Sequence, residues 1–330
     1  MCIRDSRNTC YDGHKTEQLL AGLASWSPAV RKRSAEALSR REGDFLSVLL
    51  KQLAAVNRDA RYGACEALRC LGPRADAAAP LLRALLKDSD PWLRSLACKA
   101  LVALGPEARK ASVSDLLTLT AQPHPADPRG MVQRVASMAL FSPYPGSGDP
   151  KSILAESLEG VDRHLLYPAI QAVLQNQDGA ARGSLNRIYD KFTDQDLAVL
   201  MPAILKAIRD LAPSDEMFGD GIRLAGLDLV SRLHIREGMP LCVAVIEPHR
   251  WGGGKRLPKC LECLARYGVH AKEVLPQLKA MRQNPGLLGG SAPVIDKAIA
   301  EIEASTAAPT LVDLKAFMAH PTTVREKTKR

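Results

Sequence analysis

Aromatic side chains are scarce in this chain of 330 residues, where Phe, Trp and Tyr together account for 4% of the sequence. The hydrophobic fraction of 46% is nevertheless ample for a core. That core has to be built mainly from Leu, Ala, Val and Ile, whose compact side chains suit the close packing of one helix on another. The composition therefore favours a helical protein.

Long hydrophobic runs are also missing. No stretch of 18 apolar residues occurs, which excludes a transmembrane helix. The N-terminus lacks the charged and then apolar pattern of a signal peptide. Residues Met1–Ser6 fit no helix pattern and resemble an adaptor-derived stub. We therefore expect residues 1–16 to be non-native or disordered, and the natural protein to begin further upstream.

Cysteines are too few for a disulfide scaffold, with eight in the whole chain. Most occupy small apolar positions of predicted helices, which indicates buried free thiols. Free thiols favour a reducing compartment such as the cytoplasm, although a periplasmic location stays open if a leader precedes this sequence. The net charge of +9 permits acidic partners without demanding them.

One helical pattern recurs in the first half of the chain. Small residues and a leucine follow one another at steps of three and four, which places them on one face of a helix. The small residue lets a neighbouring helix come close, and the leucine fills the space beside it. The four copies are Arg31-x-x-Ser34-x-x-Ala37-Leu38, Arg61-x-x-Ala64-x-x-Ala67-Leu68, Arg94-x-x-Ala97-x-x-Ala100-Leu101 and Gln133-x-x-Ala136-x-x-Ala139-Leu140.

Helix stop and start signals flank these copies. Leu71-Gly72-Pro73 and Leu104-Gly105-Pro106 predict a left-handed glycine cap followed by a proline that cannot continue the helix. Asp90-Pro91 predicts the opposite end, an N-cap oxygen followed by proline in the first turn.

A partner helix precedes each copy, and its clearest form is Pro80-x-Leu82-x-x-Leu85. We count eight helical hairpins between residues 17 and 303. A single hairpin is too small to bury its own apolar face, so the hairpins must stack. Further first helices begin at Pro168, Pro202, Pro240 and Pro276, with forms lacking proline at Leu20, Leu50 and Leu116; later second helices follow Arg182, Arg223, Leu257 and Ala292.

Residues 90–105 follow the pattern D-x-x-[VL]-R-x-x-A-x-x-A-L-x-x-L-G, which resembles the short bacterial HEAT repeat of phycobilisome-lyase-like proteins. This resemblance is specific over residues 17–140 and loose over 163–303. The later part also resembles a bacterial HEAT-containing domain of unassigned function, which sometimes follows a PDZ-like module. The resemblance implies an all-α fold, an α-α superhelix of the ARM/HEAT type, and brings no activity with it.

Interruptions of the repeat predict the domain organisation. Residues 142–150, Ser-Pro-Tyr-Pro-Gly-Ser-Gly-Asp-Pro, form the strongest break, and an extra helix is expected near residues 153–158. The predicted parts are an N-terminal stub (1–16), a regular array (17–141), a break with the extra helix (142–162), a divergent array (163–303), and a linker with a short helix near 311–319 and a basic tail (304–330).

Candidate chemical motifs are explained by packing. Cys260-x-x-Cys263 has the spacing of a metal or redox pair. However, aligning Tyr267-Gly268 with Leu104-Gly105 puts both thiols in small core positions. The glycines at 252–254 lack the remaining residues of a P-loop. No metal or cofactor is expected, and no catalytic residue is assigned.

Basic and aromatic residues outside the core are the candidates for binding a partner or an anion. Arg31, Arg61 and Arg94 recur at one repeat position and are expected to be structural, paired with Asp59 or Asp90. The candidate binding residues are Arg33, Arg40 and Arg41 on one helix face; Arg163, His164 and Tyr167 at a helix start predicted to be capped by Asp162; and Arg250, Trp251, Lys255 and Arg256 around the glycine-rich loop.

Three function classes follow. The leading hypothesis is a non-catalytic scaffold that binds an extended protein partner on the concave side of the solenoid, through the second helices. A nucleic-acid-binding module is the second, motivated by the basic charge. A lyase-like enzyme or the arm of a hydrolase is the third, and the lyase would require an exposed, activated thiol. The sequence leaves the oligomeric state open.

Overall fold

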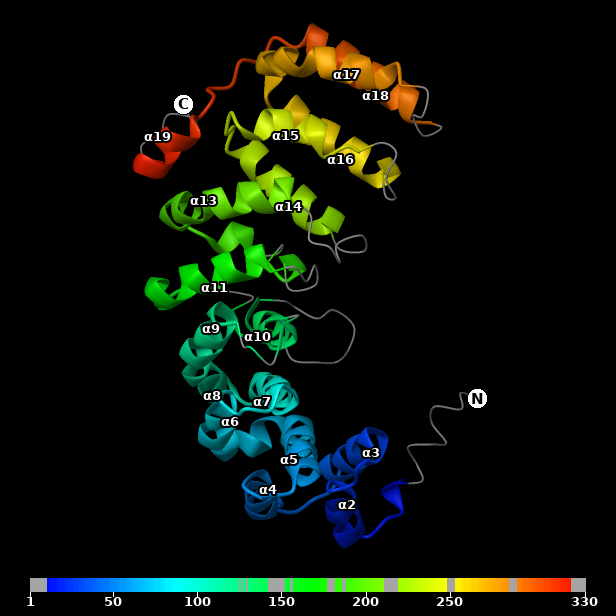
Figure 1. Cartoon of the computed structure of the whole chain (residues 1–330), viewed down its shortest axis with the longest axis vertical. Coiled ribbons are helices and arrows are strands. Elements are labelled where there is room, and N and C mark those ends of the chain that lie inside the picture. Colours follow the sequence, from blue (N-terminus) through cyan, green and yellow to red (C-terminus); the bar gives the residue numbers. More distant parts are fainter. Residues whose placement is uncertain are drawn as a thin grey trace. The chain divides into compact units, whose positions relative to one another are not determined.

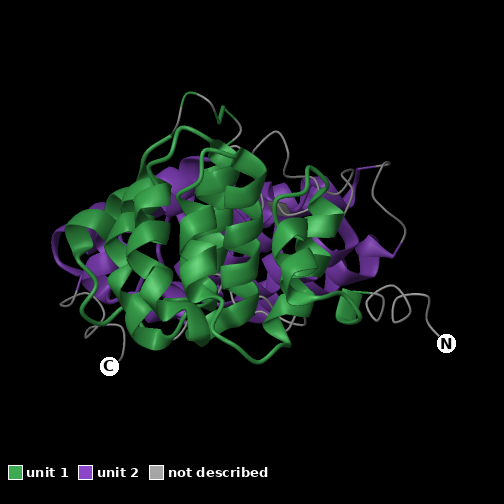
Figure 2. Ribbon diagram, turned by 90° about the horizontal axis from the view of Figure 1, so that it is seen from below, with its two compact units in different colours: residues 1–169 green, residues 170–330 purple. Residues whose placement is uncertain are grey.

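The chain is built from α-helices, as a computed structural model shows (Figure 1). Apart from one isolated bridge between Ile235 and Val312, the described residues contain no β-structure. Two compact units divide the chain, residues 1–169 and 170–330 (Figure 2). The structure describes residues 11–123, 125, 127–128, 130–141, 152–154, 157–176, 182–185, 188–210, 219–247, 253–284 and 290–321.

Unit 1 stacks four helical hairpins, whose second helices pack directly on one another in the order α3, α5, α7 and α10. Short helices η1 and α8 lead into the third and fourth hairpins. The bounds are α2 (Thr16–Gly22), α3 (Pro28–Ser39), α4 (Leu46–Leu53), α5 (Arg58–Leu71), η1 (Gly72–Ala78), α6 (Ala79–Leu85), α7 (Pro91–Ala103), α8 (Pro106–Ala111), α9 (Val113–Ala121) and α10 (Met131–Phe141).

Unit 2 repeats the plan, with α14, α16 and α18 as successive second helices. The preceding helix α11 (Arg163–Gln175) crosses the division between the units. The remaining bounds are η2 (Tyr189–Lys191), α13 (Asp194–Arg209), α14 (Gly219–Arg232), α15 (Gly238–Ala244), α16 (Gly253–Ala265), η3 (Gly268–Val274), α17 (Leu275–Arg282), α18 (Ser291–Ala304) and α19 (Leu314–Ala319).

This arrangement confirms the predicted α-α solenoid. Seven hairpins are complete in the described residues, and α11 is the first helix of another at the predicted place. The core consists of the predicted small and aliphatic positions: the side chains of Ala64, Ala97 and Ala136 have no exposed surface. Because the core faces are lined by alanines and leucines, the second helices approach closely and bury each other's apolar stripe.

The predicted caps are confirmed in part. The Asp90 carboxylate accepts a hydrogen bond from the backbone N–H of Trp92 at 2.9 Å, and Pro91 follows it in the first turn. Gly72 has a positive φ of 60°, although its ψ of −133° lies outside the left-handed helical region. Gly105 is extended, with φ −65° and ψ 168°, so the left-handed cap predicted there is wrong.

Close approach explains the glycine at position 105. Its N–H donates to the Asp76 carboxylate at 2.6 Å, and a Cβ at Gly105 would lie 2.4 Å from that carboxylate. Glycine is therefore needed here for space rather than for its backbone dihedral angles.

Two other expectations are corrected. The extra helix near residues 153–158 is not found in the described residues, because Ile153 and Leu154 form a turn whose N–H groups bond to the carbonyls of Ala139 and Leu140 at 2.9 and 2.7 Å. Of the residues 1–16 that were expected to be non-native or disordered, residues 11–16 are ordered, with Asp12 bonded to Arg40 and Arg41 at the end of α3; a non-native origin of residues 1–16 stays a prediction. The predicted boundary at 142–162 stays a prediction, since residues 142–151 lie outside the described part.

The segment after α18 runs back along unit 2 as a strap, defined here as residues 305–319. Its backbone bonds to the turns that follow two second helices: Val269 N–H donates to Ala307 O at 2.7 Å, and Val312 N–H donates to His234 O at 2.9 Å. Val312 and Phe317 are buried as its apolar anchors. The sequence predicted a linker and a short helix here, but not this attachment.

Candidate functional site

The arginine near the start of each second helix joins neighbouring hairpins. Arg31 lies 3.0 Å from Asp59 of the next hairpin, and Arg61 lies 2.6 Å from Asp88. The predicted pairing with Asp59 is confirmed, whereas Asp88 takes the place of the predicted Asp90. Such partly buried pairs hold neighbouring hairpins together, because removing one partner leaves the charge of the other partly buried and without a counter-ion.

The same position caps the first helix of its own hairpin. Arg94 Nε donates to the carbonyl of Leu86 at 2.9 Å, and Arg223 Nε donates to the carbonyl of Ile208 at 2.8 Å. Gln133 replaces arginine in the fourth hairpin and still donates to a carbonyl 13 residues earlier, at 2.9 Å. These donors satisfy carbonyls that a helix end leaves without partners. The side chains of the arginine ladder therefore serve the packing and capping of the hairpins.

The predicted basic face of α3 contacts the described part of the N-terminal segment. Arg40 forms an ion pair with Asp12, with Nε 3.1 Å from the carboxylate. Arg41 donates to the backbone carbonyl of Asp12 at 3.0 Å, and the guanidinium carbon of Arg33 lies 5.9 Å from the ring centroid of Tyr11. A role of these three arginines in partner binding stays a prediction, and a partner would meet the N-terminal segment there as well.

The second predicted group lies at the start of α11. Asp162 caps this helix as predicted, since it accepts from the backbone N–H of His164 at 2.8 Å. Arg163 folds back and donates to the carbonyl of Leu158 at 2.7 Å. The His164 side chain is exposed and that of Tyr167 is half-buried. The contacts of Arg163 serve the local backbone, and partner binding by this group stays a prediction.

The third group is divided by the structure. Arg250 and Trp251 lie outside the described residues, and Lys255 is exposed in the first turn of α16. The side chain of Arg256 is only 1% exposed and forms an ion pair with Asp220 at 2.8 Å. Burial removes Arg256 from the predicted anion-binding set.

Arg256 instead takes the arginine position of its hairpin. It donates to the carbonyls of Ile246 and Glu247 at 3.2 and 3.0 Å, at the end of the preceding first helix. The sequence alignment had put Leu257 in that position. The predicted alignment of this helix is therefore wrong by one residue.

The six cysteines within the described residues are free, and all except the half-buried Cys70 are buried. Burial disfavours the thiolate and raises the pKa of Cys98 and of Cys260 to about 12, and it raises the pKa of Cys263 as well. The described part of the chain holds no group of three or more His, Cys, Asp and Glu side chains placed to bind a metal ion. Cys260-x-x-Cys263 thus belongs to the core, as predicted.

These thiols make a testable prediction. With Cys2 and Cys10 replaced by serine, we expect Cys70 to react first with a small disulfide probe and the other thiols to react only on unfolding. Since burial raises the pKa of Cys70, its rate should keep increasing above the ordinary thiol pKa of about 8.5. Rapid reaction of several thiols at neutral pH, followed by absorbance, would contradict this and revive the lyase-like alternative.

An ion-pair network covers the seam between α14 and α16. Asp228 lies 2.9 Å from Arg266 and 3.2 Å from Lys259, and Glu262 lies 2.8 Å from each of these cations. The hydrogen bond from Lys259 lowers the pKa of Glu262. The charged groups over this seam are therefore engaged with one another, and the apolar stripe beneath them is covered.

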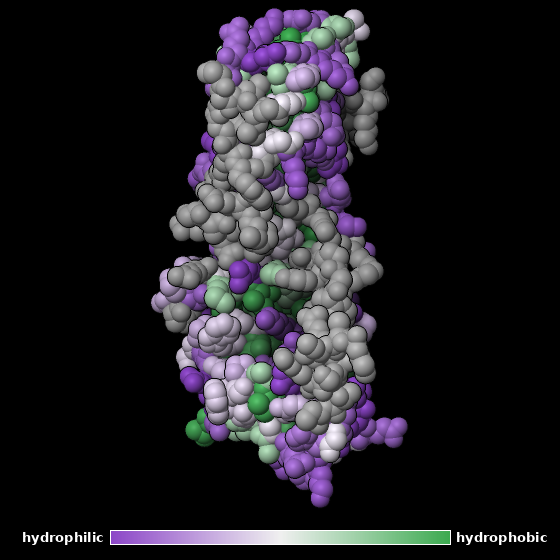
Figure 3. All heavy atoms as spheres, turned by 90° about the vertical axis from the view of Figure 1, so that its right-hand side faces the viewer, coloured by the Kyte–Doolittle hydropathy of each residue, from purple (hydrophilic) through white to green (hydrophobic). Residues whose placement is uncertain are grey.

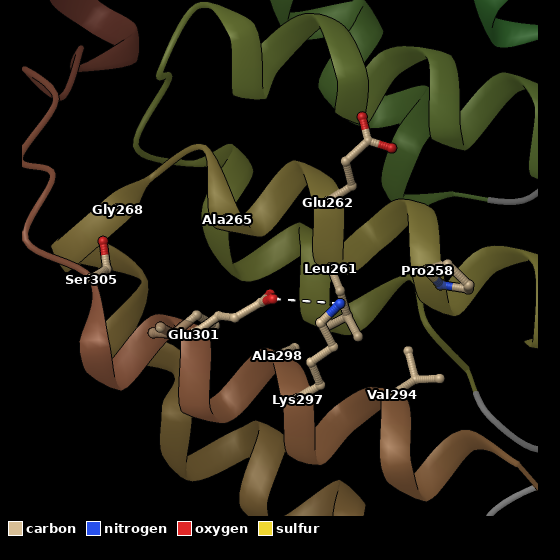
Figure 4. Close-up of a pocket in the computed structure, with 11 residues that line it drawn as sticks. Pro258, Leu261, Glu262, Ala265, Gly268, Val294, Lys297, Ala298, Glu301 and Ser305 are labelled. Carbon is tan, nitrogen blue, oxygen red and sulfur yellow. Dashed lines mark ion pairs between the residues drawn. The ribbon is translucent and has the colours of Figure 1, made fainter.

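The next seam, between α16 and α18, is an open groove of about 390 Å³ (Figure 4). Lys297 forms an ion pair with Glu301 of its own helix at 3.7 Å, rather than with a residue of α16 (Figure 4). Among the described residues no ion pair joins α16 to α18. The groove is lined by Pro258, Leu261, Glu262, Ala265, Gly268, Val294, Lys297, Ala298, Glu301, Ile302 and Ser305.

Small side chains make this groove hollow. Ala265 on α16 and Ala298 on α18 lie among its walls, and Val294 is partly exposed at one end. Leu261 and Ala265 are four residues apart, as are Val294 and Ala298, so each pair lies on one helix face. The groove consequently has an apolar floor between two second helices.

Unit 1 also exposes apolar groups, among them Trp92 on the second helix α7. Helices α7 and α10 lie to the right of α6 and α9 in Figure 1, and the view of that side shows hydrophobic patches among hydrophilic ones in its lower half (Figure 3). The sequence prediction favoured the non-core residues of second helices but named none in the groove. Val294 and Ala298, which lie four residues apart beside the charged Lys297 and Glu301, were the available signal.

In the described residues no helix has the length and hydropathy needed to cross a bilayer.

Comparison with protein families matches residues 46–137 to HEAT repeats. No curated protein shows significant similarity to the chain. The crystal structure of the Escherichia coli protein YibA is similar at a TM-score of 0.57 and 14% identity, over 92% of this chain and 98% of that one. The chain is thus an α-α solenoid that carries HEAT repeats over residues 46–137.

Proposed function

We propose that this protein is a non-catalytic scaffold that binds a protein partner on its second helices, with the groove between α16 and α18 as the main contact in unit 2. The observation that carries the proposal is a difference in polarity between two neighbouring helix–helix seams. The α14/α16 seam is closed by ion pairs, whereas the α16/α18 seam exposes an apolar floor. HEAT repeats generally serve as protein-interaction scaffolds, which supports this assignment.

The walls of the groove favour an apolar occupant. Glu262 is held by Lys259 and Arg266, and Lys297 lies beside Glu301, so the charged groups at the rim have partners. An apolar side chain of the partner would displace water from the floor without leaving a buried charge unpaired. An amphipathic helix laid along α16 and α18 has the shape and chemistry for this role.

The alternatives have less support. The helical arginine face that suggested nucleic-acid binding contacts the N-terminal segment, since Arg40 forms an ion pair with Asp12 and Arg41 donates to the carbonyl of Asp12. The lyase-like alternative needs an accessible activated thiol, and burial raises the pKa of Cys260 and of Cys70. No specific observation therefore favours a second function.

A charge placed in the groove tests the proposal. We expect Val294→Glu to reduce capture of the bound protein at least tenfold, because its carboxylate would have to be buried against the partner's apolar side chain. The tagged wild-type chain and the variant are incubated with an extract of the source cells, and recovered proteins are quantified by mass spectrometry. Binding of the protein recovered is then measured directly with purified components.

Val199→Glu is the matched control. Val199 lies on the first helix α13 of the same unit and is 38% exposed, against 37% for Val294. Both substitutions add the same charge at similar exposure, so circular dichroism should report equal folding. Recovery of the same proteins in the same amounts by both variants and by the wild type would contradict the proposal.

A further inference from the structure

Large apolar side chains are exposed at the same edge of three successive hairpins in unit 1. Trp26 lies between α2 and α3, Val56 lies between α4 and α5, and Trp92 is the second residue of α7. Their exposed fractions are 84%, 103% and 60%. We call these three residues the loop edge. Exposed tryptophans in a chain with so few aromatic residues indicate a binding surface, because tryptophan is enriched among residues that dominate binding energy.

The backbone of the loop edge is held in place by hydrogen bonds. Arg31 donates to the carbonyl of Trp26 at 3.1 Å. Asn57 caps α5 by accepting from a backbone N–H at 2.9 Å, and Asp90 caps α7 by accepting from the N–H of Trp92 at 2.9 Å. The apolar side chains therefore project from an ordered backbone, which lowers the loss of conformational entropy on binding a partner.

The spacing along the loop edge is set by helix packing. Helices α3, α5 and α7 pack directly on one another, and packed helices are about 8–10 Å apart. A polyproline II segment has three residues per turn and a rise of about 3.1 Å per residue, which gives a repeat of about 9.3 Å. One face of such a segment thus presents a side chain at each step of the loop edge.

Charge at this edge is positive. Asp59 and Asp88 form ion pairs with arginines at 3.0 and 2.6 Å, whereas Asp90 accepts a hydrogen bond from a tyrosine hydroxyl and keeps its negative charge. Arg58 lies over an aromatic ring, 5.8 Å from its centroid, and Lys87 is exposed. In the described residues neither of these two cations is joined to a carboxylate by an ion pair. Two cations set against the single charge of Asp90 leave the edge with an excess of one positive charge, which favours an acidic partner.

We propose that the loop edge binds an extended, proline-rich and acidic segment of a partner protein in the polyproline II conformation. Proline rings would stack on the indoles of Trp26 and Trp92, and the prolines between them would pack on Val56. Carboxylates on the intervening turns would approach Arg58 and Lys87. Aromatic surfaces are the usual receptors of polyproline II segments, since these segments are already extended before binding.

Synthetic peptides test this surface. The probe is a peptide of four Pro-Pro-Glu repeats, titrated into the full chain while tryptophan fluorescence and calorimetric heat are recorded. We expect binding that weakens at least tenfold in the double variant Trp26→Ala/Trp92→Ala. Leu81→Ala, which removes an exposed apolar side chain from α6, should leave the affinity unchanged. Because both tryptophans are highly exposed, the double variant should keep the wild-type fold, and circular dichroism checks this.

Two further peptides separate the contribution of the polyproline II conformation from that of the negative charge. Four Gly-Ser-Glu repeats keep the charge but lose the preformed helix, and four Pro-Pro-Lys repeats keep the helix but reverse the charge. Both should bind at least fivefold more weakly. Equal binding of either peptide, no binding of the Pro-Pro-Glu probe, or no effect of the tryptophan substitutions would overturn the proposal. Two other results would also overturn it: dimerisation of the wild type, or its adsorption to phosphatidylserine vesicles, that the double variant abolishes. The occupant of the loop edge would then be a second copy of the chain or a membrane.

Discussion

Replacing Gly63 by alanine should destabilise unit 1 by about 3 kcal/mol. Gly63 lies within α5, where alanine is intrinsically favoured over glycine by about 1 kcal/mol. However, a Cβ at this position would lie 2.0 Å from the carbonyl oxygen of Leu23 and 2.8 Å from its Cα. These are backbone atoms that cannot rotate away, so the end of α2 and α5 would have to separate. The tertiary contact therefore reverses the sign of the local preference.

Gly254→Ala is the matched control. Gly254 is also helical, near the start of α16, and a Cβ there would meet no atom within 4 Å. Alanine should leave stability unchanged or increase it by up to about 1 kcal/mol. Urea unfolding of both variants, followed by circular dichroism, provides the comparison, and hydrogen exchange locates the loss. If Gly63→Ala is as stable as the wild type, the close approach of α5 to Leu23 is wrong.

Replacing Arg256 by alanine should cost about 3 kcal/mol, the lower end of the range for breaking a buried ion pair. The guanidinium is bonded to Asp220 and to the carbonyls of Ile246 and Glu247. Its removal leaves three acceptors without their donor, although the partial exposure of Asp220 allows water to relieve some of the penalty. Unit 2 should consequently unfold at a lower urea concentration.

Lys255→Ala provides the comparison for Arg256. Lys255 is the neighbouring cation but is exposed, and its removal should change stability by less than about 0.5 kcal/mol. The pair of variants also separates the two interpretations of the glycine-rich loop. If Arg256→Ala weakened binding of inorganic phosphate while stability stayed the same, the original assignment of Arg256 to an anion site would be restored.

The two functional surfaces proposed for this protein differ in how visible they are in the sequence. Trp26 and Trp92 fall outside the predicted core stripes, so their exposure could have been inferred from the repeat alignment. The groove between α16 and α18 could not, because it depends on which side chains face each other on the second helices of two consecutive hairpins. The sequence analysis therefore predicted the second helices as the binding side but did not indicate the seam at which they open.

The strap shows a similar division. It attaches where the N–H that follows Gly268 donates to Ala307 O. At the matching glycines of unit 1 the next residues are Pro73 and Pro106, which have no N–H to offer. The sequence contains this difference, but its meaning depends on knowing that residues 305–319 return to this turn.

The repeat, the hairpin order, the Asp90 cap and the structural arginine at the start of the second helices were determined by the sequence alone. They rest on the periodicity and capping of consecutive residues, and those are local properties of the chain. Tertiary structure decided the burial of Arg256, the extended backbone at Gly105, the strap and the open groove. Each of these depends on the distance between segments far apart in the sequence, where a shift of one residue along a helix turns a side chain by about 100°.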